Sequence, residues 1–106
     1  MNERGKASLL SMIGLSKKAG HAICGTDMVC DAVRRGKICL VLAAEGVSDN
    51  TKKKLNDKCA YYGVKLIFIP ALPDELGHAV GKSGAVAAVG IDDAGFAASI
   101  ESKLNL

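Results

Sequence analysis

The feature that most constrains the fold of this sequence is a regular alternation of helix-type and strand-type segments. Apolar residues at helical spacing predict helices over about 3–18, 26–36 and 73–80. They also predict a third helix that Ser48 or Asn50 caps and Gly63 ends, and a last helix that Asp92 caps. Short runs rich in β-forming residues lie between them, over 21–24, 37–44, 64–69 and 85–91. This order predicts an α/β fold, a three-layer α/β/α sandwich whose small, mixed four-stranded sheet has helices on both faces.

The apolar patterns also predict which elements form the core. The nearly continuous apolar run from Lys37 to Ala44 indicates a strand that is buried on both faces, and the run over 64–69 predicts a second central strand. Strands that a helix connects are expected to be parallel. Helical spacing turns Tyr62 inward, and Phe68 and Phe96 are also expected in the core. An aromatic platform for stacking bases is therefore not expected.

The size and composition of the chain predict one globular domain over residues 1–106. Of its 106 residues, 49% are hydrophobic and 24% charged, which suits a folded chain. No apolar run approaches the roughly 20 residues that cross a bilayer, and no signal-peptide cleavage site is evident, so the expected location is the cytoplasm. Without a Cys-x-x-Cys pair, we expect reduced thiols and neither a metal nor another cofactor at the four cysteines, Cys24, Cys30, Cys39 and Cys59.

Charge is unevenly distributed along the chain. Residues 1–65 carry twelve Lys or Arg and six Asp or Glu, whereas residues 66–106 carry two and five. This asymmetry is typical of a protein with one side that meets a polyanion, although an ordinary solvated surface fits it equally well.

Motifs of enzymes are missing from the sequence. It contains no Walker A sequence, no dinucleotide-binding glycine pattern and no His-Glu-x-x-His. Adjacent aspartates at 92 and 93 are typical of a helix cap and a dipole partner rather than a catalytic pair. We therefore expect neither an enzyme nor a small-molecule substrate.

Two loops are the candidate binding segments. In the first, Gly25-Thr26-Asp27-Met28, Thr26 is expected to cap a helix whose free amide groups favour phosphate or polar base edges. The second loop runs from Gly81 to Val86 and joins flexible, cationic and small apolar residues. Cations flank the first loop at Lys17 and Lys18, and the run from Lys52 to Lys54 is a further basic patch. The alternatives are a plain capped helix and a simple connection.

Several segments together resemble a known family. The stretch from Gly25 to Lys37 resembles the signature of the kink-turn-binding ribosomal protein superfamily, which contains the L7Ae and L30e ribosomal proteins and the Gadd-type stress proteins. The segments 9–20, 40–45 and 76–81 resemble its opening helix, its buried strand and its Leu-Gly-x-Ala-x-Gly segment. The region of Lys52-Lys53-Lys54 and Tyr61-Tyr62 is similar to the short bacterial members.

The resemblance implies the same α/β/α sandwich and places the two candidate loops side by side on a sharply bent RNA with sheared G·A pairs. It implies an RNA-binding, ribosomal-protein-like accessory factor, with structured RNA and the ribosome as candidate partners. Where the family pattern has Asn, Glu and Lys, this chain has Asp27, Met28 and Asp31. A protein–protein interaction module of the Gadd type, with Met28 as an apolar anchor, is the alternative. The residues expected to contact RNA are Lys17, Lys18, Gly25, Thr26, Asp27, Met28, Asp31, Lys82, Ser83, Gly84, Ala85 and Val86.

Overall fold

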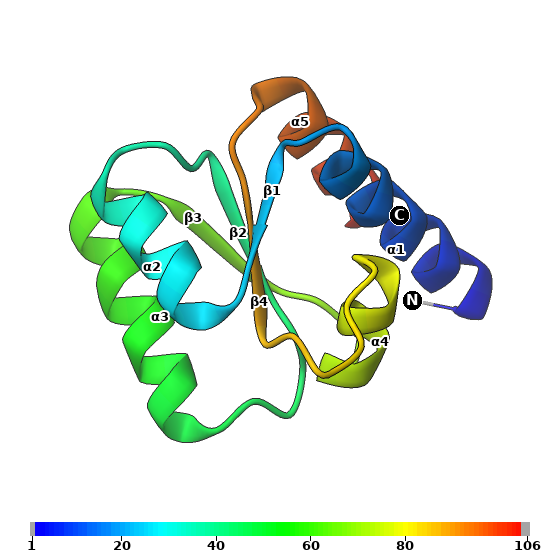
Figure 1. The fold of residues 1–106 in the computed structure, drawn as a ribbon, viewed down its shortest axis with the longest axis horizontal. Helices are drawn as coiled ribbons and strands as arrows, with labels where there is room; N and C mark the ends of the chain where they lie inside the picture. Colours follow the sequence, from blue (N-terminus) through cyan, green and yellow to red (C-terminus); the bar gives the residue numbers. More distant parts are fainter. Residues whose placement is uncertain (1, 105–106) are drawn as a thin grey trace.

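A computed structural model describes residues 2–104 of the protein, within which five helices and four strands alternate (Figure 1). The predicted order of elements is confirmed. In chain order they are α1 (Glu3–Lys18), β1 (Ala22–Cys24), α2 (Thr26–Arg34), β2 (Leu40–Ala43), α3 (Asp49–Tyr62), β3 (Lys65–Phe68), α4 (Pro73–Ala79), β4 (Ala88–Ile91) and α5 (Ala94–Leu104). None of these helices has the length and apolar character needed to cross a membrane.

The four strands form one mixed sheet in the order β1-β4-β2-β3. β2 and β3 are parallel, and β4 runs antiparallel to both β1 and β2. The mixed sheet was predicted, but the placement of β3 as a central strand was wrong. The chain crosses from β3 through α4 to the other side of β2, so β4 takes the central position and β3 is left at the edge.

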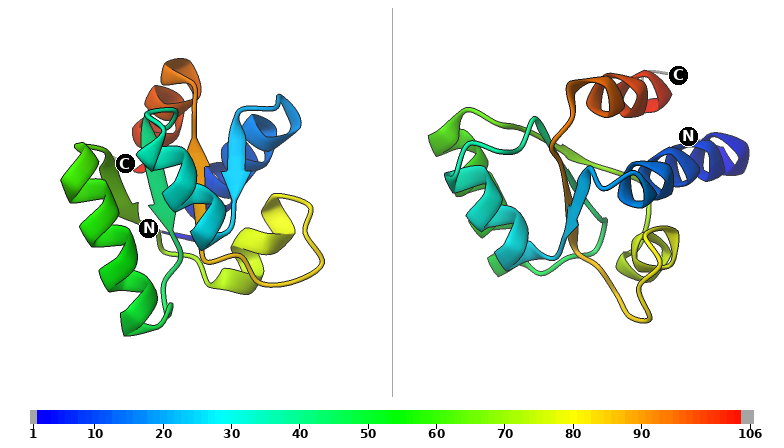
Figure 2. Two further views of the ribbon diagram at one scale, coloured as in Figure 1. Left: turned by 60° about the vertical axis from the view of Figure 1, so that its left-hand side comes forward. Right: turned by 45° about the horizontal axis from the view of Figure 1, so that its top comes forward.

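Helices cover both faces of the sheet, as predicted (Figures 1 and 2). α1, α4 and α5 lie on one face, and α2 and α3 lie on the other. Alternate residues of β2 serve the two cores: Leu40 and Leu42 pack toward α1, whereas Val41 and Ala43 pack toward α2 and α3. All four are fully buried, which confirms that this strand is covered on both faces.

The helix caps differ in two places from the sequence predictions. Gly25, not Thr26, is the N-cap of α2, because Thr26 already has helical geometry. The α5 cap is Asp93, whose carboxylate accepts a hydrogen bond from the Phe96 amide at 2.8 Å. Asp92 instead pairs with His21 Nδ1 at 2.8 Å and so links the start of β1 to the end of β4.

Two aromatic residues predicted in the core are partly exposed. The exposed fraction is 39% for Tyr62 and 40% for Phe68, whereas Phe96 packs against the core as expected. Phe68 ends β3, which has no neighbouring strand on its outer side, and Tyr62 is the last residue of α3. Helical spacing turns Leu55 and Cys59 into the core, but in the last turn of α3 the neighbouring elements cover Tyr62 only in part.

Candidate functional site

The N-termini of α2, α3 and α4 lie along one edge of the sheet, at the ends of β1, β2 and β3 (Figure 1). β4 begins at the same edge because it runs antiparallel to β2. Each helix directs its first-turn amide groups and the positive end of its dipole toward this edge. This edge is therefore suited to negatively charged or hydrogen-bond-accepting ligands.

At this edge the first candidate loop meets the start of β4, the strand that follows the second candidate loop. The amide of Gly25 donates a hydrogen bond to the carbonyl oxygen of Ala88 at 2.9 Å, which joins the turn before α2 to the start of β4. Gly25 has φ 101° and ψ 140°, a conformation that residues with a Cβ rarely adopt. The turn before α2 thus requires glycine at position 25.

Helix α2 begins without a side-chain cap. Side-chain oxygens of Asn2, Ser48 and Asp93 accept hydrogen bonds from the first turns of α1, α3 and α5, but no side chain does so at α2. In the described part of the chain, the first-turn amides of α2 are therefore left for solvent or a ligand.

Backbone hydrogen bonds to α4 hold the loop that follows this helix, residues 81–86. The Lys82 amide donates to the Gly77 carbonyl at 2.9 Å, and the Val86 amide donates to the Pro73 carbonyl at 3.0 Å. A Cβ added to Gly77 would lie 2.0 Å from the Gly84 carbonyl oxygen. This close approach of helix and loop is therefore possible only with glycine at position 77.

The loop exposes four of its five candidate residues, Lys82, Ser83, Gly84 and Ala85. Val86 is placed differently, because its side chain is 7% exposed and belongs to the core beneath α4. Its role at this edge is to anchor the loop, not to present an apolar side chain to a ligand.

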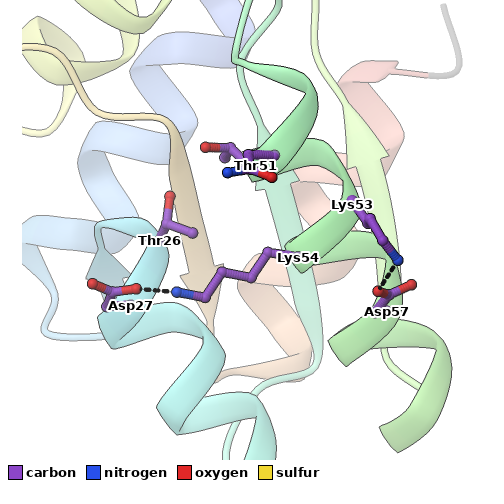
Figure 3. A pocket seen from close by; sticks show the side chains of 7 residues that line it. Thr26, Asp27, Thr51, Lys53, Lys54 and Asp57 are labelled. Carbon is purple, nitrogen blue, oxygen red and sulfur yellow. Dashed lines mark hydrogen bonds and ion pairs between the residues drawn. The ribbon is translucent and has the colours of Figure 1, made fainter.

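The start of α2 also borders a polar groove shared with α3 (Figure 3). The groove has a volume of about 570 Å³ and is lined by Thr26, Asp27, Asn50, Thr51, Lys53, Lys54 and Asp57. Lys54 of α3 reaches across it and forms an ion pair with Asp27 of α2. This hydrogen bond raises the pKa of the Lys54 ammonium.

Asp31 does not stand as a free negative charge. Its carboxylate pairs with Arg34 at 2.8 Å and with Arg35 at 3.8 Å, one turn further along α2. These cations hold the pKa of Asp31 below its usual range. Asp31 therefore belongs to an ion-pair cluster at the C-terminal end of α2.

Met28 lies in the sequence between the two paired aspartates of α2, Asp27 and Asp31. It is an exposed apolar residue, with 65% of its surface accessible.

The candidate cations fall into two places. Burial raises the pKa of the Cys24 thiol, while the charges of Lys17 and Lys82 act on it in the opposite direction. Both ammonium groups therefore lie close enough to the Cys24 thiol, at the end of β1, to act on it. Lys18 lies instead in a groove between α1 and α4 that Glu75 and His78 also line.

Sequence reasoning missed the contribution of α3 to this edge. Lys54 was considered only as part of a solvated basic run, although its ammonium contacts Asp27, which is 27 residues away. No local signal predicts this pair, because it depends on how α2 packs against α3. The exposed Tyr61 and Tyr62 were also missed.

Comparison with protein families gives one match across most of the chain. The profile of the ribosomal protein L7Ae/L30e/S12e/Gadd45 family matches residues 7–101. Two similar proteins are both called RNA-binding protein YlxQ. The one from Bacillus subtilis is 36% identical and covers 89% of this chain and 92% of that protein. The one from Enterococcus faecium is 37% identical and covers 92% of this chain and 91% of that protein.

Solved structures share the fold. A protein with unknown function from Bacillus halodurans superposes with a TM-score of 0.86 at 32% identity, covering 94% of this chain and 99% of that one. The 15.5kD RNA binding protein of Giardia lamblia superposes with a TM-score of 0.77 at 22% identity, covering 99% of this chain and 88% of that one. At that identity, the second likeness bears on the fold alone.

Proposed function

Because this chain belongs to the ribosomal protein L7Ae/L30e/S12e/Gadd45 family, we propose that it is an RNA-binding accessory factor that grips bent, kink-turn-like RNA. The two YlxQ relatives, which are named as RNA-binding proteins, support an RNA partner. The proposal includes association with ribosomal RNA in the cytoplasm and no catalytic step.

The observation that carries the proposal is the uncapped start of α2 beside β4. Gly25 and Ala88 share a backbone hydrogen bond, which ties the start of α2 to the strand that follows the exposed loop 82–85. In this proposal the α2 amides hold a phosphate, and Lys17 and Lys82 neutralise neighbouring phosphates. The small residues of the loop let an RNA backbone approach closely.

Base recognition falls to Asp27 and Lys54 in this arrangement. An ionised carboxylate only accepts hydrogen bonds and an ammonium only donates them, so together they match the amino and carbonyl edges of a purine. The ion pair between them fixes the Asp27 carboxylate beside the first turn of α2. We therefore expect a polar contact here that differs from one made by an asparagine amide.

The proposal is tested by titrating the protein with two labelled RNAs of equal length. One is bent by tandem sheared G·A pairs, and the other is a straight duplex. We expect binding to the bent RNA to be at least about tenfold tighter, and to weaken steeply between about 50 and 200 mM salt, because several phosphates are contacted. Equal affinity for the two RNAs would overturn kink-turn recognition, and no binding of either would overturn the RNA-binding role.

The exposure of Met28 favours a second candidate, a protein-interaction module. A large apolar side chain with 65% of its surface accessible is a natural anchor for a protein partner. Under this alternative, the protein shows no preference for bent RNA, and changing Met28 to Ser abolishes a protein complex that survives nuclease treatment.

A further inference from the structure

The last turn of α3 carries an exposed pair of aromatic rings. The exposed fraction of Tyr61 is 82%, and the ring centroids of Tyr61 and Tyr62 lie 4.8 Å apart in an edge-to-face arrangement. Tyrosines usually bury much of their ring surface. Here the Tyr62 ring packs against the Tyr61 ring, and most of Tyr61 remains exposed to solvent.

Cations flank the rings. Lys58 lies one turn earlier on α3 and lines, with Asp57 and the two tyrosines, a hollow of about 310 Å³. Asp57 is paired with Lys53 at 2.9 Å, whereas Lys58 pairs with no carboxylate among residues 2–104. The pKa of the Arg34 guanidinium is raised, chiefly by its hydrogen bond to Asp31. Tyr62 lies close enough to add to this effect.

A row of side chains connects these tyrosines to the proposed RNA edge. Lys54, Lys58 and Tyr61 follow one another at i, i+4 and i+7 and therefore share one side of α3. That side faces α2, because Lys54 forms an ion pair with Asp27 of α2. The distance along the helix from Lys54 to Tyr61 is only about 10 Å.

We propose that Tyr61, Tyr62, Lys58 and Arg34, which we call the tyrosine patch, bind unpaired nucleotides that continue from the bent RNA. This proposal rests on the proposed function. Bases stack on an exposed aromatic face irrespective of sequence, and the cations beside the rings match the phosphates of the strand. Lys54, Lys58 and Arg34 lie where α2 packs against α3, and this row of positive charges favours a nucleic-acid strand as the occupant.

The composition of the chain supplies a direct readout. The protein has no tryptophan and only two tyrosines, both in the patch, so its intrinsic fluorescence reports on this surface alone. The experiment compares the bent RNA ending flush with the same RNA carrying four unpaired nucleotides on either strand in turn. We expect one of the two extensions to tighten binding at least about fivefold and to quench tyrosine emission, while the flush RNA leaves the emission nearly unchanged.

Two variants separate stacking from a general effect. Tyr61→Ala should abolish the gain from the extension and leave the affinity for flush RNA intact, whereas Tyr61→Phe should retain most of the gain. Leu15→Ala removes an exposed apolar side chain from α1 and is the matched control, expected to behave as the unmodified protein.

The outcomes distinguish the two proposals. Tight binding of flush RNA with no gain from either extension overturns the tyrosine patch and leaves the proposed function standing. Binding of single-stranded nucleotides with tyrosine quenching, but no binding of the bent element, supports the patch and overturns kink-turn recognition. A gain that persists in Tyr61→Ala also overturns the patch.

Discussion

Replacing Gly77 with alanine tests how the candidate RNA-binding loop is held in place. The new Cβ would lie 2.0 Å from the Gly84 carbonyl oxygen and 3.4 Å from the Val86 amide nitrogen. Nonbonded heavy atoms prefer separations of about 3.5 Å, so the loop must move away from α4 by roughly 1 Å or more. Both neighbours are backbone atoms, and no side-chain rotation relieves the contact.

The expected loss of stability follows from two opposing effects. Overpacking costs about 1–3 kcal/mol, and the backbone contact places Gly77→Ala near the upper end of this range. Alanine favours the helix over glycine by about 1 kcal/mol, which leaves a net loss of about 2 kcal/mol. For a chain of this length, that loss lowers Tm by about 8–16 °C.

Thermal unfolding followed by circular dichroism measures this effect, and titration with bent RNA measures its consequence for binding. Gly84→Ala is the control for stability, because an added Cβ there meets nothing within 4 Å. We expect its Tm to stay close to that of the unmodified protein, while Gly77→Ala lowers both Tm and RNA affinity. A Gly77→Ala protein that is as stable as the unmodified one would refute the proposed packing. Reduced stability with unchanged RNA affinity would refute a role of the loop in binding.

Three further predictions concern charges and thiols. Lys54→Met should weaken binding of bent RNA several-fold, because a hydrogen-bond donor is lost beside Asp27; an unchanged affinity would place Lys54 outside the interface. The Leu72 amide and the Lys6 ammonium lower the pKa of Glu75, so its ionised form stabilises the fold above pH 4.5 and this contribution disappears as the pH falls through the lowered pKa. Glu75→Gln should therefore lower Tm at pH 7 but not in strong acid, and a pH-independent difference in thermal melts would contradict this assignment. Cys39 is exposed, whereas burial raises the pKa of the other three thiols, so a thiol reagent at pH 7 should modify one cysteine rapidly, and Cys39→Ser should remove this fast phase.

The order of helices and strands was predictable because its signals are local. The apolar spacing of α1 and α3 and the continuous apolar run before Ala44 reflect which side of each element is buried. The position of β3 in the sheet was not predictable in this way. Its apolar residues suit an edge strand and a central strand equally well. Which position β3 takes depends on the side of β2 to which the connection through α4 leads β4.

The candidate site was only partly readable from the sequence. The turn at Gly25 and the Gly81–Val86 loop were predicted as candidate binding segments, and their adjacency was implied only by the family resemblance. The bond between Gly25 and Ala88 depends on how β1 pairs with β4 and could not be read from either segment. The pairing of Asp31 with Arg34 follows ordinary helical spacing of i and i+3. The pairing of Asp27 with Lys54 does not, because it requires the packing of two helices.

The exposure of the two tyrosines illustrates the same limit. Helical periodicity indicates the direction in which a side chain points, and it correctly turned Leu55 and Cys59 into the core. It carries no information on whether another element extends far enough to cover that direction. At the end of α3 the cover is incomplete, so Tyr62, a residue predicted as core, is 39% exposed.

The central claim, that RNA is held at the edge formed by the Gly25 turn and the 82–85 loop, is tested most directly by mapping amide chemical shifts. The ¹⁵N-labelled protein is titrated with bent RNA, and backbone amide shifts are recorded for each residue. We predict that the largest changes fall on residues 25–28 and 82–88, with smaller changes along Lys54 and Lys58. Changes confined to the groove between α1 and α4, around Leu15 and His78, with the Gly25 turn unaffected, would contradict it.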